Sequence, residues 1–435
     1  MSNNNNETQQ KQRRKTIPLR PENANPNYLT LIKGFVGKEL SKMALPVEFN
    51  EPLSMLQRQT EELEYSYLLD LASKEKDLFK QMSLICVFVI SGYSTISLRT
   101  TKPFNPLIGE TFECDRREDK GWRSIAEQGT NICLKPCGQT LIKFKDGNTF
   151  SYGKLSTSTS LDSIMSNGNS KKNGSSLNEN KVEISGQLII SGSKAKAVLT
   201  FFGDCKKSEQ YSKKYVTGKV FDNENIERYQ IEAQWDKWAK ILKIGEKSNF
   251  EEIVWNSTEL PPNSNKMHNF TQFAIELNEE EMGIAPTDSR RRPDQRLCEL
   301  GEFGAANRLK KCLEQAQRER IKEKGKDYQP KWFVLLNGLS KEQQQPLYKF
   351  TGEYWKAKET QNWDNCPELF LFDYFLISLY EKMACECDCC KNNVCCPSGG
   401  DCCKDGCKNC KCANCNCSKN CGATCGANQQ SCCAK

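Results

Sequence analysis

The stretch KPFNPLIGE, residues 102–110, combines a lysine, an asparagine and two prolines with a short apolar run. Proline fixes φ, lacks a backbone donor and pushes the preceding residue out of the helical region. Pro103 and Pro106 therefore predict a stiff, extended corner that neither joins a helix nor runs inside a sheet. Because Lys102 and Asn105 are carried on this corner, we expect it to hold a charged or polar group in a fixed position.

The hydrophobic period differs on the two sides of the corner. Residues 53–82 have helical spacing and contain no proline or glycine, which predicts one or two helices. Residues 140–155 alternate around an Asp-Gly-Asn turn, and KVEISGQLII (181–190), KAVLTFFG (196–203) and NFEEIVWNS (249–257) read as further strands. Such runs at short spacing predict an antiparallel sheet that closes into a barrel.

The chain becomes helical again after the strand region. Residues 305–324 are rich in strong helix formers and in charge, which predicts one long charged helix. We expect the following segment, with Trp332, Tyr354 and Trp355, to pack back on the barrel.

Composition limits the function classes. The 435 residues carry a net charge of +7, with short basic clusters at 11–15 and 290–292 and no long basic stripe, which argues against nucleic-acid binding. Contact with anionic membrane surfaces stays open. The apolar runs 84–90 and 369–380 are too short to span a bilayer, and the first residues lack a signal-peptide core, so we expect a cytosolic protein.

Nothing in the sequence indicates an enzyme. The chain has one histidine, His268, and lacks a nucleophile elbow, a Walker loop and an H-E-x-x-H helix. Histidine is the usual acid–base group near neutral pH, so its scarcity favours a binding protein over a catalyst.

Several blocks of sequence resemble the oxysterol-binding-protein-related family of lipid-transfer proteins, in a short form. They span residues 27–380 in the family's order and read LPVEFNEPLSMLQR (45–58), YSTISLRTTKPFNPLIGETFE (93–113), GIAPTDSRRRPDQRL (283–297), NRLKKCLEQAQR (307–318), and YQPKWF with GEYW (328–333 and 352–355). The resemblance implies a large, nearly closed antiparallel β-barrel around a lipid tunnel, with flanking helices and an N-terminal lid at about 27–45. A wide barrel can leave its interior free for a ligand.

The resemblance also implies a site at the tunnel mouth for the phosphate of phosphatidylinositol 4-phosphate. Lys102 matches the phosphate-binding lysine and Asn105 the residue that supports the polar part of the lipid. Lys310, Glu314 and Arg318 match the family's basic helix, and their spacing of four puts them on one helix face. Taken alone, the corner reads as a turn with a solvated lysine, and the helix as an exposed charge ladder.

One part of the family signature is changed. The family reads Glu-Gln-Val-Ser-His-His-Pro-Pro, whereas this chain reads EQGTNICL from Glu127 to Leu134, with Asn131 and Ile132 in place of the two histidines. A hydrogen bond to a charged group contributes about 1.5–3 kcal/mol, so losing two predicts phosphoinositide binding weaker by about a hundredfold. A neutral lipid in the tunnel is less affected.

The last 51 residues, 385–435, hold 17 of the 25 cysteines and no Leu, Ile, Met or aromatic residue. This tail resembles a metallothionein, which implies thiolate sites for Zn²⁺ or Cu(I) in a reducing compartment. The predicted metal ligands include Cys385, Cys387, Cys389, Cys390, Cys407, Cys410, Cys412, Cys415 and Cys417. Alternatives are S-acylation of the Cys-Cys pairs and a tail without function.

The sequence thus predicts a disordered Asn/Lys-rich segment at 1–24, a lipid-binding domain at 25–384 with an inserted flexible loop at about 156–181, and a Cys-rich tail. The expected function is transfer of a sterol or phospholipid between membranes by a cytosolic protein that associates with their surfaces. A lipid sensor or scaffold that does not transfer, and a metal-binding protein localised by lipid, are the alternatives.

Overall fold

The computed structural model describes most of the chain up to residue 370. The residues described are 12–21, 45–99, 101–129, 139–159, 182–203, 214–245, 251–324, 328–335, 348–364 and 366–370. Most of the expected lid, most of the inserted loop and the whole Cys-rich tail lie outside these residues.

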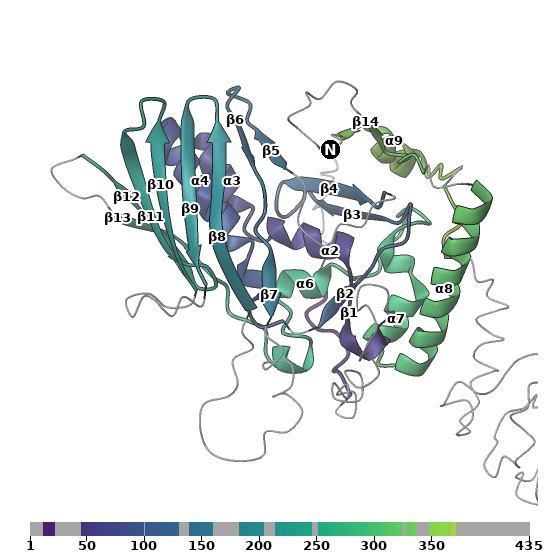
Figure 1. Ribbon diagram of the computed structural model, residues 1–435. Helices are drawn as coiled ribbons and strands as arrows, with labels where there is room; N and C mark the ends of the chain where they lie inside the picture. The colour runs from purple at the N-terminus through teal and green to yellow at the C-terminus, as the bar shows by residue number, and fades with distance from the viewer. Residues whose placement is uncertain are drawn as a thin grey trace, which may run out of the picture.

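The largest element is a nine-stranded antiparallel sheet (Figure 1). Its order is β13-β12-β11-β10-β9-β8-β6-β5, and β7 pairs with β8 beside this path. The strands are β5 (Thr140–Lys143), β6 (Thr149–Tyr152), β7 (Thr157–Thr159), β8 (Val182–Gly192), β9 (Ala195–Phe202), β10 (Tyr215–Asp222), β11 (Glu227–Gln234), β12 (Trp238–Lys243) and β13 (Glu251–Asn256). The predicted large antiparallel sheet with helices is confirmed, whereas closure into a barrel stays a prediction.

The sheet is packed on one face. Side chains in β9 and β11 alternate between buried and more exposed, as expected when one face of a sheet meets the core. In the middle of β10, Gly218 leaves room for both neighbouring strands, because a Cβ there would lie 2.6 Å from Leu199 Cδ2 and 3.0 Å from Ile231 Cβ.

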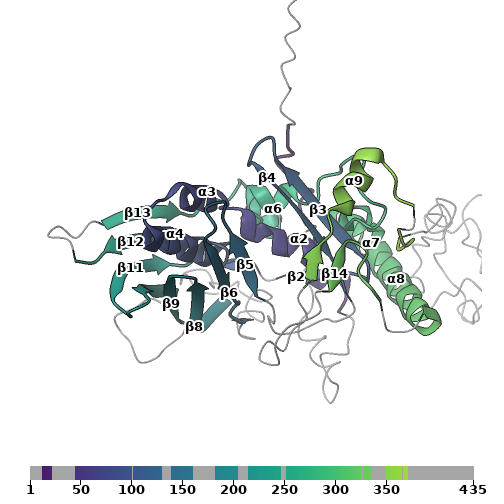
Figure 2. The ribbon, with the colours of Figure 1, turned by 90° about the horizontal axis from the view of Figure 1, so that it is seen from above.

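Helix α4 (Leu78–Ser91) lies on the inner side of the curved sheet and contacts strands β9 to β13 (Figure 2). It starts at Asp77, whose carboxylate caps the backbone N–H groups of Phe79 and Lys80. The stretch Leu78–Ile96 is long and apolar enough to cross a membrane, but 72% of it is buried inside the protein. It therefore reads as a core helix, and α3 (Tyr67–Lys74) packs beside it.

A second group of elements includes the KPFNP corner. It contains η3 (Val47–Phe49), β1 (Asn50–Ser54), α2 (Met55–Thr60), η4 (Glu61–Leu63), η5 (Ser94–Ile96), β2 (Lys102–Phe104), β3 (Thr111–Arg116), β4 (Trp122–Glu127), η6 (Ser264–Lys266), α6 (Gln272–Glu276), η7 (Ser289–Arg291), α7 (Pro293–Glu299) and α8 (Phe303–Lys324). The predicted long helix is α8. The helices predicted for 53–82 are shorter than expected, because residues 50–54 form β1 and a capping box at Ser54 starts α2.

The aromatic segment forms a small cluster of its own. Strands β14 (Phe333–Leu335) and β15 (Tyr348–Phe350) pair, and α9 (Glu353–Thr360) follows them. Trp332, Tyr354 and Trp355 pack together with Ile125 of β4. Their neighbour in the described part of the sheet region is thus the β3–β4 pair, and packing on a closed barrel stays a prediction.

Two predicted boundaries need correction. The disordered segment 1–24 contains residues 12–21, which run as an extended segment, here called the strap, fixed against α6 and α7 (Figure 1). The basic composition predicted disorder, but Arg13 and Arg14 of the strap form ion pairs with carboxylates distant in sequence. The inserted loop predicted for 156–181 begins later, because residues 157–159 pair with β8 as β7.

Candidate functional site

The first three residues of the KPFNP corner form β2, one strand of a two-stranded parallel pair. Strands β1 and β2 pair with Asn50 opposite Lys102, and Ser54 opposite Phe104. The Asn50 side chain donates from Nδ2 to the carbonyl oxygens of Lys102 (3.1 Å) and Pro103 (3.2 Å). Both strands are edge strands, so a proline without an N–H donor is tolerated.

A buried guanidinium fixes the far side of the corner. Arg292 Nη1 donates to the backbone oxygen of Asn105 at 2.7 Å and to Glu110 Oε2 at 3.0 Å, and the guanidinium lies 5.2 Å from the ring centre of Phe104. Glu110 Oε2 also accepts from the Leu107 N–H at 2.9 Å. The extended backbone of the corner is thus pinned by buried ionic groups, which reduces the ordering cost of binding.

Burial and ion pairing have opposite effects on the pKa values of Glu110 and Arg292. Burial raises the pKa of Glu110, and the Arg292 guanidinium acts against this rise. Burial acts to lower the pKa of Arg292, but Asp294 and Glu110 outweigh it and raise the pKa. Arg292 therefore stays charged inside the protein, held between two carboxylates.

Helix α8 brings a second cation to the corner. Lys310 Nζ donates to the backbone oxygen of Leu45 at 2.6 Å and lies 3.6 Å from Glu314 Oε1. The Lys102 side chain is exposed to solvent, yet partial desolvation of its ammonium group by the surrounding protein lowers its pKa. The Lys310 charge lowers the pKa of Lys102 further and Glu314 opposes it. Lys102, Lys310 and Glu314 therefore influence one another electrostatically, and the three are called the lysine group below.

The other two predicted residues are less closely attached to this group. The Asn105 side chain is exposed, and the recorded contact of the residue is through its backbone oxygen. Arg318 is exposed on α8 and donates to Gln315 Oε1 of its own helix at 3.0 Å. The roles assigned to both residues stay predictions.

The end of the corner is tied to α8 and to the following sheet. The Ile108 N–H donates to Gln317 Oε1 of α8 at 2.8 Å, and the Gly109 N–H donates to the Gln128 oxygen at 2.9 Å. Gly109 has φ of +83°, and a Cβ there would lie 3.0 Å from Tyr328 Oη. Glycine is thus required both by conformation and by space.

The surviving part of the altered signature has a structural role. Glu127 Oε1 accepts from the Lys331 N–H and from Tyr328 Oη, both at 2.7 Å, and its Oε2 accepts from the Trp332 N–H at 2.9 Å. Glu127 therefore positions the segment that carries the aromatic cluster. Residues 130–134, where the histidines of the family would stand, lie outside the described residues.

Sequence reasoning missed the buried role of the basic triplet 290–292. Arg290 and Arg292 are buried, and Arg290 pairs with Asp288 at 2.8 Å. Arg291 is exposed. Two of the three arginines thus form buried ion pairs and are not available to bind a membrane. The signal in the sequence was the pair of aspartates, Asp288 and Asp294, that lie two residues before Arg290 and two residues after Arg292.

His268 is half-buried, with Nδ1 at 3.4 Å from Thr101 Oγ1. Burial lowers its pKa to about 3, the Arg20 charge acts in the same direction, and Glu51 opposes both. The imidazole therefore stays neutral near pH 7.

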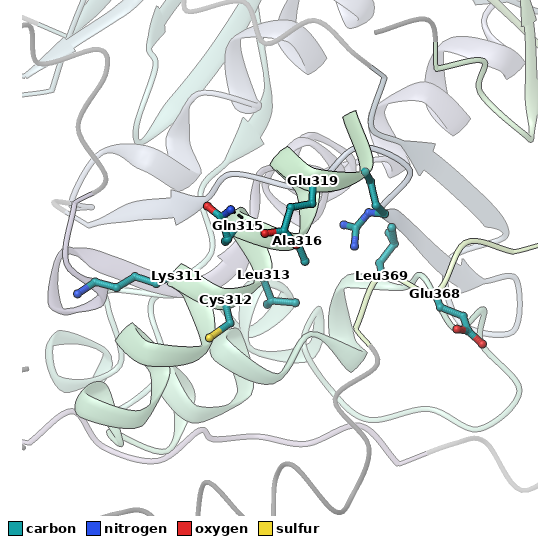
Figure 3. A pocket seen from close by; sticks show the side chains of 9 residues that line it. Lys311, Cys312, Leu313, Gln315, Ala316, Glu319, Glu368 and Leu369 are labelled. Atoms are coloured by element: carbon teal, nitrogen blue, oxygen red, sulfur yellow. Dashed lines mark hydrogen bonds between the residues drawn. The ribbon is translucent and has the colours of Figure 1, made fainter. Parts of the chain in front are cut away.

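A pocket of about 390 Å³ lies on another face of α8 (Figure 3). Leu313 of α8 and Leu369, from the segment after α9, face it together. Its other lining residues include Lys311, Gln315 and Glu319, each one position along from the predicted residues 310, 314 and 318. One position corresponds to about 100° around a helix, so this pocket and the lysine group occupy different faces.

In the described part of the chain, no group of three or more metal-binding side chains occurs. The described free cysteines are Cys86, Cys114, Cys298, Cys312 and Cys366. Burial raises the pKa of the Cys114 thiol to about 12 and suppresses its thiolate form. The predicted metal ligands belong to the tail, outside the description.

Comparison with solved structures supports the fold. The Osh1 ORD domain in complex with cholesterol superimposes with a TM-score of 0.70 at 24% identity, covering 83% of this chain and 95% of that one. The Osh3 ORD domain in complex with PI(4)P, from Saccharomyces cerevisiae, superimposes with a TM-score of 0.65 at 28% identity, covering 82% and 99%.

Comparison with curated sequences points the same way. Over 82% of its own length, the chain is 35% identical to oxysterol-binding protein 2 of Mus musculus. Over 78% of its own length, it is 32% identical to oxysterol-binding protein-related protein 2B of Arabidopsis thaliana. It spans 44% and 52% of those two relatives, about half their length. The family model described as oxysterol-binding protein matches residues 27–131 and 128–359. This chain therefore belongs to the oxysterol-binding protein family.

Proposed function

We propose that the protein binds one sterol or phospholipid molecule in the interior of its sheet domain and transfers it between membranes. Family membership confirms that the chain is not an enzyme. The observation that carries the proposal is the rigid corner, on which the Lys102 ammonium is influenced by the charges of Lys310 and Glu314, which form an ion pair on α8. Buried apolar surface of a few hundred Å² supplies about 10 kcal/mol for extracting a lipid.

The anionic headgroup of a phospholipid fits the lysine group. An ammonium is a compact point charge suited to phosphate, and mutual repulsion between Lys102 and Lys310 is relieved when an anion binds. Related structures carry cholesterol and PI(4)P, which supports both ligand classes. Because Asn131 and Ile132 replace two histidines, we propose weaker phosphoinositide binding than in relatives that keep the pair.

Lipid extraction tests this function. The full chain is incubated with liposomes that contain sterol, phosphatidylcholine and phosphatidylinositol 4-phosphate, then separated from them, and its bound lipid is identified by mass spectrometry. The proposal expects about one lipid per chain, and delivery to acceptor liposomes. Binding without delivery would favour a lipid sensor, and no bound lipid from any mixture would contradict the proposal.

A second function is favoured by the composition of the tail. We propose that residues 385–435 bind several Zn²⁺ or Cu(I) ions through cysteine thiolates, since 17 of the 25 cysteines lie there and histidine does not. Reduced full chain and a chain ending at Ala384 are reconstituted with metal, and their metal content is compared. Less than one additional equivalent in the full chain would contradict metal binding, and fatty acid on cell-derived protein would favour S-acylation.

A further inference from the structure

The strap, residues 12–21, is held by side chains of opposite charge. Arg14 forms a two-pronged ion pair with Glu299, with Nη1 and Nη2 at 2.8 and 3.0 Å from the two carboxylate oxygens. Arg13 Nη1 lies 2.6 Å from Glu281 Oε1 and 3.3 Å from Glu279 Oε2. Two adjacent arginines therefore contact an acidic cluster of Glu279, Glu281 and Glu299, here called the groove.

Backbone and apolar contacts fix the strap in an extended form. The Arg14 N–H donates to Glu279 Oε1 at 3.0 Å, and the Gln272 side chain donates to the Arg14 oxygen at 2.8 Å. Ile17 is 4% exposed and belongs to the core formed by α2, β3 and α6. Further along, the Arg20 N–H donates to the Lys266 oxygen at 2.9 Å.

Thr16 lies between these anchors and is exposed. The order Arg13-Arg14-Lys15-Thr16-Ile17 places two arginines three and two residues before a hydroxyl and an apolar residue after it. Basophilic serine/threonine kinases read substrates by this charge pattern in an extended chain, with carboxylates for the arginines and an apolar pocket for the residue that follows. The groove and such a kinase therefore compete for the same side chains.

We propose that Thr16 is a phosphorylation site for a basophilic kinase, and that phosphorylation keeps the strap out of its groove. The Thr16 hydroxyl oxygen attacks the γ-phosphorus of ATP, its proton passes to the kinase base, and ADP leaves. The new phosphate carries about −1.5 to −2 charge at pH 7. It is repelled by the glutamates of the groove and offers Arg13 and Arg14 an alternative partner within the strap.

The proposal predicts how fast Thr16 is modified. The kinase acts only on the released strap. The apparent rate of phosphorylation is therefore the rate for a free peptide multiplied by the fraction of molecules in which the strap is open. A synthetic peptide of residues 10–21 should be phosphorylated at least tenfold faster than the folded full chain. Glu299→Gln, which weakens the groove without changing the kinase recognition sequence, should raise the rate in the folded chain at least threefold. Glu302→Gln, an exposed carboxylate nearby, is the matched control and should change nothing.

The consequence for the strap is measured by hydrogen exchange on the full chain. The Arg14 and Arg20 amides should be protected before modification and exchange nearly as fast as in the peptide after it. Thr16→Val should keep protection in the presence of kinase and ATP. The proposal is overturned if the peptide is not modified at Thr16, if the folded chain is modified as fast as the peptide, if Glu299→Gln and Glu302→Gln behave alike, or if the phosphorylated chain keeps its protection.

Discussion

At the residue scale, Lys102 and Lys310 form the proposed headgroup site, and charge reversal tests whether their positive charge is needed for binding. Reversing Lys102 or Lys310 to glutamate should weaken binding to liposomes with phosphatidylinositol 4-phosphate by about tenfold or more, because a hydrogen bond to a charged group contributes about 1.5–3 kcal/mol. Liposome flotation measures this.

The matched control is Lys311→Glu, which changes net charge equally on a different face of α8. It should reduce binding much less, and sterol extraction should stay nearly the same in all three variants. Equal losses for Lys310→Glu and Lys311→Glu would mean that net charge alone, rather than the corner, attracts the lipid.

Glu64 gives a second residue-scale prediction. Burial and the nearby Glu61 charge raise its pKa to about 7, and the hydrogen bond from Thr271 acts against this rise. Because the folded state favours the protonated acid, this contribution to stability is complete below pH 4.5 and is lost as pH rises through about 7.

Glu64→Gln should therefore raise the free energy of unfolding at pH 8 by about 1–3 kcal/mol and change it little at pH 4.5. Denaturant unfolding at several pH values measures the difference between the variants. The exposed Glu118→Gln should show no such pH dependence. A difference that grows toward low pH would contradict the assignment.

At the element scale, the corner depends on the buried Arg292. Arg292→Leu should lower the free energy of unfolding by about 3–5 kcal/mol, because it leaves Glu110 and Asp294 buried without their cation. Arg291→Leu, the exposed neighbour in the same triplet, should cost well under 1 kcal/mol. Thermal or denaturant unfolding compares them. Similar losses would show that the triplet acts through its overall charge.

The sequence predicted helices and strands better than it predicted which parts of the chain contact one another. Alternation in 181–203 and 249–257 identified strands, and the composition of 305–324 identified α8, because both signals are local. Strands β10 to β12 were not singled out, since charged residues interrupt their pattern. The strap was misread and the structural role of Glu127 was missed, because each contacts residues more than 200 positions away, which no local pattern records.

At the scale of the whole molecule, the strap joins the start of the chain to a region near residue 300. Removing residues 1–21 should lower the free energy of unfolding by about 1–3 kcal/mol, since an apolar side chain and partly buried ion pairs are lost. Removing only residues 1–11, which lie outside the described residues, should have a much smaller effect. Denaturant unfolding of both deletions measures this, and equal effects would contradict a role for the strap.

The separation of Arg14 and Glu299, 285 positions, also has a consequence for synthesis. At about 5–20 residues per second, a ribosome needs about 15–60 s to reach Glu299 after it has made Arg14. The nascent strap has no groove to enter during that interval. During that interval docking does not compete with a kinase for the Arg13–Ile17 recognition sequence, so the protection expected of the folded chain begins only after Glu299 has been made.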